Sequence, residues 1–299
     1  MEHFSPKLYK ILFVGIEILE DGVSYRIERV ITDMKKKSFV IVLIILIALF
    51  FIGQGSVYNI AKLKGYKALK VITYYNNTKL NKSSDSFQTD HFIINSRSIN
   101  EKTSEEIGVL LEKSYYLIGK EFNHYPVIIY GSMDDFWEQN KALDGQTVMG
   151  LYYMGIIHLI VPDVFDMDLY EYEKNGPVLH EYTHKVVDDI CGGNIDIWFT
   201  EGLALYQEYL NYGTNWGEGL VFNNEYSIEE LRDNFLSLES VQAYKQSFEI
   251  VKNICNGQKK EKIIELLKEL GKGKNMEDAF LNVYGEILYK QKIDLRLSS

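Results

Sequence analysis

Cysteine, proline and basic residues are the side chains that this sequence has in short supply. Of its 299 residues, only two are cysteines and four are prolines. Cys191 and Cys255 are too few for a disulfide framework and do not form a C-x-x-C motif. We expect buried free thiols, with a single bridge between them as the alternative outside the cytosol. Few prolines and 46% hydrophobic residues indicate an ordered globular protein.

Positive charge is also scarce, because 32 Lys and Arg residues face 42 Asp and Glu residues, a net charge of −10. Proteins that bind nucleic acid need a basic surface to neutralise phosphates, so nucleic acid is excluded as an expected partner. The length suffices for one domain of about 240 residues with a sizeable core, preceded by an N-terminal extension.

One long apolar run lies near the N-terminus. Residues 39–53 carry no charge and follow the triple lysine Lys35-Lys36-Lys37. Extended to 38–58, the segment can cross a bilayer of roughly 30 Å. We predict a transmembrane signal anchor after a cytosolic tail, residues 1–37, because no clear cleavage site follows and the lysines favour an N-terminus inside. The alternative is a cleaved signal peptide with its true start at Met34. Both interpretations place the remainder outside the cytosol.

The sequence His180-Glu181-Tyr182-Thr183-His184 is an HExxH motif in a segment with helical periodicity. The spacing i, i+4 puts both imidazoles on one face of a helix, as two ligands of a tetrahedral zinc site require. Glu181 points about 100° away, where it can reach a metal-bound water without becoming a ligand. We therefore predict His180 and His184 as zinc ligands and Glu181 as the general base.

A second acidic segment, Trp198-Phe199-Thr200-Glu201-Gly202-Leu203-Ala204, follows the motif. It puts Glu201 at the head of another apolar helix, and Gly202 allows two helices to approach closely. Two histidines and one glutamate leave the fourth zinc position open, which is the catalytic pattern. Glu201 is therefore the predicted third ligand of one Zn2+ ion.

The HEYTH motif and the W-F-T-E-G-L-A segment resemble the gluzincin metallopeptidases, in particular the peptidase-MA-like branch, over residues 92–289. The resemblance implies an α+β fold in which a mixed α/β N-terminal lobe precedes a helical C-terminal lobe, here as a domain over 91–299. It also implies hydrolysis of peptide or protein substrates, cut internally. The family commonly stabilises the oxyanion with a Tyr or His of the helical lobe, which makes Tyr244 a catalytic candidate.

Several other polar residues are weaker candidates. His158 lies on a strand that the family places along the cleft, but a lone strand histidine is more often structural. Asp188, Asp189 and Glu208 could orient a ligand imidazole, although a solvated helix surface is the simpler interpretation. Gly131-Ser132-Met133-Asp134-Asp135 departs from the G-x-M-E-N signature of gluzincin aminopeptidases, which argues against that activity.

Two other functions compete with a membrane-anchored, extracytoplasmic zinc metallopeptidase. A catalytically silent domain could use the same fold for binding or cell-envelope assembly, but the intact Glu181 argues against it. An intramembrane zinc protease would place HExxH inside a transmembrane helix, and the charged residues flanking the motif speak against that.

Hydrophobic periodicity predicts the order of the elements. Residues 1–33 resemble a β-hairpin without an assigned function, and 59–90 is expected to be a juxtamembrane linker rich in polar residues. Strands are expected at 91–95, 126–130, 148–153 and 155–161. Helices are expected from Ser104, at 177–190 for the zinc motif, and then at 199–211, 227–236, 239–254, 258–270 and 275–285.

Overall fold

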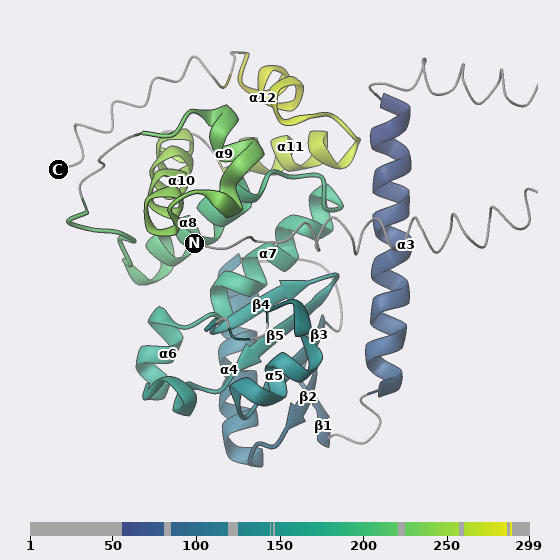
Figure 1. Cartoon of the computed structure of the whole chain (residues 1–299), viewed down its shortest axis with the longest axis vertical. Coiled ribbons are helices and arrows are strands. Elements are labelled where there is room, and N and C mark those ends of the chain that lie inside the picture. Colours follow the sequence, from purple (N-terminus) through teal and green to yellow (C-terminus); the bar gives the residue numbers. More distant parts are fainter. Residues whose placement is uncertain are drawn as a thin grey trace, which may run out of the picture. The chain divides into compact units, whose positions relative to one another are not determined.

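The computed structural model describes residues 56–80, 85–118, 125–143, 145, 147–220, 225–256, 260–285 and 288 (Figure 1). Two units are distinguished, Met1–Ala61 and Lys62–Ser299. The predicted tail over 1–37 and hairpin over 1–33 lie outside the described residues, as does the predicted anchor over 38–58 apart from its last three positions. Within the described ranges, no helix has both the length and the hydrophobicity that a membrane span requires.

The predicted linker over residues 59–90 is regular structure for most of its length. Helix α3 covers Ser56–Leu80, and strand β1 covers Asp85–Gln88. Leu63 is buried, and Tyr66 and Lys70 are partly buried. These positions follow helical spacing and therefore share one face. The expectation of a linker was wrong here because that face packs on residues more than 100 positions later in the chain.

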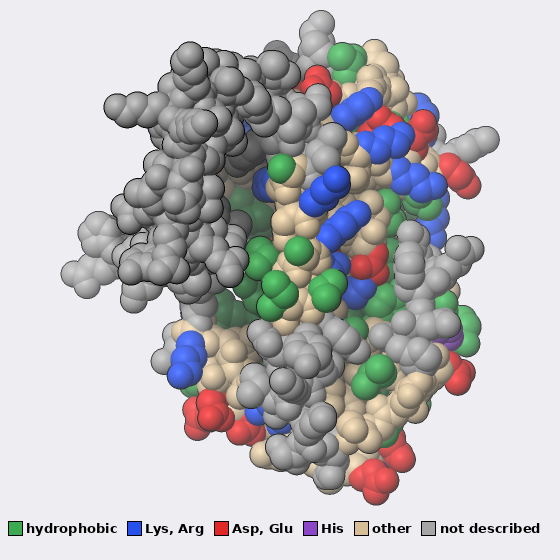
Figure 2. Space-filling view, turned by 90° about the vertical axis from the view of Figure 1, so that its right-hand side faces the viewer, with side chains coloured by type: hydrophobic (Ala, Val, Ile, Leu, Met, Phe, Trp, Pro, Cys, Tyr) green, Lys and Arg blue, Asp and Glu red, His purple; other side chains and the backbone are tan. Residues whose placement is uncertain are grey.

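The opposite face of α3 is exposed. Its outward side chains combine lysines, Lys62 and Lys64, with the hydrophobic residues Leu69, Val71 and Ile72. Figure 2 looks onto this side of the molecule, where Lys and Arg side chains gather above a group of hydrophobic ones.

A five-stranded mixed sheet forms the N-terminal lobe, with the strand order β1-β2-β3-β5-β4. Strands β2 (Phe92–Arg97), β3 (Tyr125–Tyr130) and β5 (Ile156–Ile160) run parallel, so that Ile94 pairs with Val127 and Val127 with Ile157. Strand β1 is antiparallel to β2, and β4 (Gly150–Tyr153) is antiparallel to β5. Among the described strands, β4 therefore forms one edge of the sheet, and it contacts the helix that carries the HExxH motif.

Helices cover both faces of the sheet. Val127 and Ile129 point to α4 (Glu101–Ile118) and α7 (Val178–Cys191), whereas Ile128 and Tyr130 point to α5 (Met133–Gln139). This alternation follows from the two-residue period of a strand. In Figure 1, α5 lies in front of the sheet and α4 behind it. Ser132 caps α5 by accepting a hydrogen bond from the Asp135 amide.

The C-terminal lobe is helical, as the sequence predicted. After the short α6 (Leu169–Asn175) and α7, the described helices are α8 (Ile197–Tyr212), α9 (Ile228–Asn234), α10 (Ser240–Cys255), α11 (Lys260–Gly271) and α12 (Met276–Tyr284). Their shared core centres on Trp198, Phe199 and Phe280. The mixed α/β architecture with a sheet followed by helices is thereby confirmed.

Candidate metal centre

Helix α7 carries the HExxH motif, and its two ends are fixed by Pro177 and Gly192. Pro177 stands just before the first helical residue, where its missing N–H costs no hydrogen bond. At the other end Gly192 adopts φ 66°, a left-handed conformation that glycine tolerates and that ends the helix. The chain then turns through Gly193 into α8, which brings Glu201 back toward the histidines.

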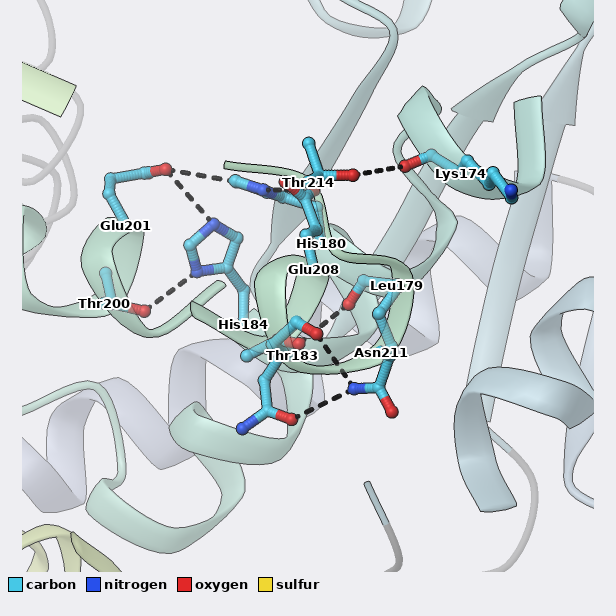
Figure 3. A network of polar contacts seen from close by, with 11 residues as sticks. Lys174, Leu179, His180, Thr183, His184, Thr200, Glu201, Glu208, Asn211 and Thr214 are labelled. Carbon is cyan, nitrogen blue, oxygen red and sulfur yellow. Dashed lines mark hydrogen bonds and ion pairs between the residues drawn. The ribbon is translucent and has the colours of Figure 1, made fainter. Parts of the chain in front are cut away.

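Three side chains converge between α7 and α8 (Figure 3). Glu201 Oε2 lies 3.1 Å from His180 Nε2 and 3.5 Å from His184 Nε2. One ligand atom from each of the three residues lies within 4.8 Å of the others, so together they could hold a metal ion. Two imidazoles and a carboxylate are a donor set that suits zinc.

A second layer of side chains orients both imidazoles. His180 Nδ1 lies 3.1 Å from Glu208 Oε1, and His184 Nδ1 lies 2.8 Å from Thr200 Oγ1 (Figure 3). If each Nδ1–H donates to its oxygen partner, both Nε2 lone pairs face Glu201 and the centre of the group. Metal-ligating histidines are typically fixed in this way. The arrangement therefore fits a metal site in both its inner and its outer partners.

Electrostatics point to the same conclusion. Burial alone would lower the pKa of His180, but contacts with Glu201 and Glu208 raise it well above its usual value. Burial would raise the pKa of Glu201, yet His184 and His180 outweigh burial and hold it well below its usual range. The group thus favours a positive charge at its centre, and a bound cation satisfies that preference in place of a proton.

Glu181 lies beside the three ligands without joining them. Its carboxylate is buried, with 8% of the residue exposed. Burial raises the pKa of Glu181, an effect that the two nearby histidines oppose. A buried carboxylate with few partners is suited to accepting a proton.

Edge strand β4 comes very close to this carboxylate. A Cβ atom on Gly150 would lie 2.9 Å from Glu181 Cγ and 2.6 Å from Pro177 Cβ. The Ile160 amide donates to Met149 O, so alternation along the strand points the backbone groups of Gly150 and Tyr152 away from β5. The outer edge of β4 therefore borders the candidate site.

Tyr244, on α10, lies on the helical side of the same region. Its ring packs against Phe235 and Trp216, with centroid distances of 5.2 Å and 5.9 Å. Burial raises the pKa of its phenol, and the negative charges of Glu201 and Glu181 raise it further. The phenol therefore stays protonated and lies within electrostatic reach of both carboxylates.

His158 and Asp188, two other candidates from the sequence, contact residues outside the metal-binding group. His158 is buried on the sheet face that carries Ile156 and Ile160, and its Nδ1 lies 2.8 Å from Tyr130 Oη. Burial lowers the pKa of His158 to about 3, so it is a neutral structural residue. The structure shows Asp188 bound to Lys70 and Tyr152 rather than to a ligand imidazole. Cys191 and Cys255 are both free thiols.

Sequence reasoning undervalued Glu208 and missed Thr200. Glu208 follows from helical spacing, because it lies two turns after Glu201 on the same face. That face was visible in the sequence. What the sequence does not contain is the crossing of α8 over α7, which decides that Glu208 meets His180.

Comparison with known families assigns this part of the chain. Residues 160–291 match the model of the Peptidase MA superfamily, and the match includes the motif on α7 and the acidic segment on α8. They form a peptidase MA domain. The predicted relationship to this superfamily is confirmed. No curated protein matches the chain.

The peptidase MA domain has a metallopeptidase-like fold, and His180, His184 and Glu201 are its candidate metal-binding group. The matched segment begins at Ile160, the last residue of β5. Most of the sheet that packs under α7 is therefore outside the match and is known from the structure alone.

Proposed function

We propose that this protein is a zinc-dependent peptidase of the gluzincin type. The observation that carries the proposal is the convergence of His180, His184 and Glu201, with the buried Glu181 on the helix of the two histidines. Three protein ligands leave one coordination position for water or substrate, which distinguishes catalytic from structural zinc sites. A zinc ion at this site would act as a Lewis acid and bring the pKa of a water molecule near 7.

The protein's own residues divide the remaining chemistry. Glu181 takes the proton of the attacking water and then passes it to the nitrogen of the departing amine. Its burial supports this role, because a raised pKa makes the carboxylate a stronger base that takes up the proton of the water more readily. The Tyr244 phenol, protonated and near Glu181, is proposed to donate a hydrogen bond to the developing oxyanion.

The substrate class follows from the edge of β4. Backbone groups of Gly150 point away from β5 and border Glu181, so an extended peptide can add to the sheet as a further strand. Main-chain pairing recognises a peptide without requiring a chain end. The proposed activity is therefore internal cleavage of peptides or proteins.

The location of the enzyme remains a proposal from the sequence. Residues 38–58 anchor the protein in the membrane, and the peptidase domain lies on the extracytoplasmic side. Recovery of a mature chain starting near Ser56 from the medium would replace the anchor with a cleaved signal peptide.

Glu181→Gln tests the catalytic proposal with the smallest change available. The amide is close to isosteric with the carboxylate but cannot take the proton, so hydrolysis of a peptide library should fall by about 100-fold or more. Zinc content and thermal unfolding should match those of the parent. Glu105→Gln, on the exposed face of α4, is the control and should cleave normally.

Two results would overturn the proposal. Activity of the Glu181→Gln protein within a fewfold of the parent would assign the base to another group. A parent protein that binds zinc yet cleaves no peptide would favour the alternative, a silent domain that functions in binding or cell-envelope assembly.

A further inference from the structure

A buried ionic cluster lies on α7 two turns beyond Glu181. Its centre is Asp188, whose side chain is only 7% exposed. Lys70 Nζ of α3 lies 2.5 Å from Asp188 Oδ2, and the Tyr152 phenol donates to the same oxygen. Three elements that are distant in the sequence, α3, β4 and α7, therefore meet at one carboxylate.

Tyr152 links this cluster to the candidate active site. Its side chain donates to Asp188, and Gly150 of the same strand lies so close to Glu181 that a Cβ there would be 2.9 Å from Glu181 Cγ. Glu181 and Asp188 are seven residues apart and so lie on the same face of α7. The edge strand thus meets α7 at two points, and one of them is the proposed general base.

Strand β4 needs such an attachment. It has four residues and pairs with β5 on one side only. A short edge strand lacks the second set of ladder hydrogen bonds that holds a central strand in place. The hydrogen bond of Tyr152 fixes the position of β4 along α7, and with it the backbone of Gly150 that packs on Glu181.

Helix α3 supplies the charge that makes the attachment stable. An unpaired carboxylate as buried as Asp188 would be strongly unfavourable, and Lys70 provides its counter-ion. The fit is close, since a Cβ on Gly155 would lie 3.1 Å from Lys70 Cε. Likewise, a Cβ on Gly193 would lie 2.6 Å from the Tyr66 ring. Packing therefore holds α3 against the turn that ends α7.

We propose that Tyr152 is a positioning residue for Glu181, and that Lys70 of α3 holds Tyr152 in place through Asp188. This inference rests on the proposed peptidase function. It makes hydrolysis dependent on α3, the helix that directly follows the apolar run in the chain. A displacement of about 1 Å at a reacting group can lower a rate by about 100-fold, so a loosened β4 should reduce turnover more than substrate binding.

The test compares single substitutions in the full-length protein. Tyr152→Phe removes only the hydroxyl, and kcat for a peptide should fall about tenfold or more, with a smaller rise in KM because the same strand borders the substrate. Tyr153→Phe removes the same group from the exposed neighbouring tyrosine and should leave both constants unchanged. Lys70→Met should reproduce the loss, and Lys70→Arg, which keeps the charge, should restore most of it. Zinc content should be equal throughout.

A double-substitution cycle separates positioning from a general effect on the fold. If Tyr152 acts through Glu181, its hydroxyl should matter much less once Glu181→Asp has shortened the base. Tyr152→Phe should then reduce kcat by less than about twofold in the Glu181→Asp protein. An equal loss in both backgrounds would show a structural role and overturn the inference.

Other outcomes are equally decisive. A Tyr152→Phe protein with the parent's kcat overturns the inference and leaves the proposed function intact. A parent protein without peptidase activity overturns the proposed function, and this inference with it. If Lys70→Met fails to fold, Tyr152→Phe and Lys70→Arg still decide the result, because neither removes a buried charge.

Discussion

Gly202 offers a severe test of how α8 and α10 hold Glu201 in place. A Cβ at this position would lie 2.5 Å from the Ser247 carbonyl oxygen and 2.6 Å from Val251 Cγ2. Ordinary contact begins at 3.4 Å, so Gly202→Ala must separate the two helices by about 0.9 Å. The carbonyl cannot rotate away because it belongs to the backbone of α10.

The expected free-energy change has two opposing parts. Overpacking a well-filled core costs about 1–3 kcal/mol, and the backbone clash places this case near the upper end. Replacing a helical glycine by alanine returns up to about 1 kcal/mol. The net destabilisation is about 2 kcal/mol, which should lower Tm by about 4–8 °C for a domain of this size.

Gly65→Ala is the matched control. Gly65 also lies in a helix, α3, but nothing lies within 4 Å of a Cβ built there. Only the gain in helix propensity remains, so Tm should rise slightly. Scanning calorimetry of the parent and both variants gives the comparison, and zinc affinity should fall only for Gly202→Ala, since Glu201 is the adjacent residue. A Gly202→Ala protein as stable as the parent would refute the close packing of α8 on α10.

Two further predictions concern the carboxylates of Glu208 and Asp196. Glu208→Gln removes the charge beside His180 Nδ1 and should weaken zinc binding by about 10–100-fold in a chelator competition, whereas the exposed control Glu105→Gln should not. Burial and the nearby Glu277 raise the pKa of Asp196 to about 6. The folded state then holds a proton that the unfolded state releases, so stability present below about pH 4 should be lost as the pH rises through 6, by about 3 kcal/mol. Urea unfolding of the metal-free protein should show that loss, and Asp196→Asn should remove it; equal pH profiles would contradict the assigned pKa.

Local pattern was enough to predict the inner part of the site. The i, i+4 spacing of His180 and His184 places both on one helical face wherever α7 lies, and Pro177 marks its start. Glu201 could be added because its segment resembles a known family. Most of the order of strands and helices after residue 91 was also predictable, since most elements carry their own hydrophobic period, but the short α6 was not expected.

Contacts between distant segments were not predictable. Lys70 was assigned to the juxtamembrane linker because its partner, Asp188, is 118 positions away in the chain. Asp188 looked like a solvated helix end for the same reason. The partnership of Glu208 with His180 depends on how α8 crosses α7, which packing decides and local sequence does not.

The most direct test of the account is the zinc content of the purified full-length protein beside its Glu201→Ala and Glu105→Ala variants. We predict one zinc ion per chain in the parent and in Glu105→Ala, measured by inductively coupled plasma mass spectrometry after dialysis. Glu201→Ala should lose stable binding while its helices remain folded by circular dichroism. A parent protein without stoichiometric zinc, or a Glu201→Ala protein that retains it, would contradict the metal site on which the proposed function depends.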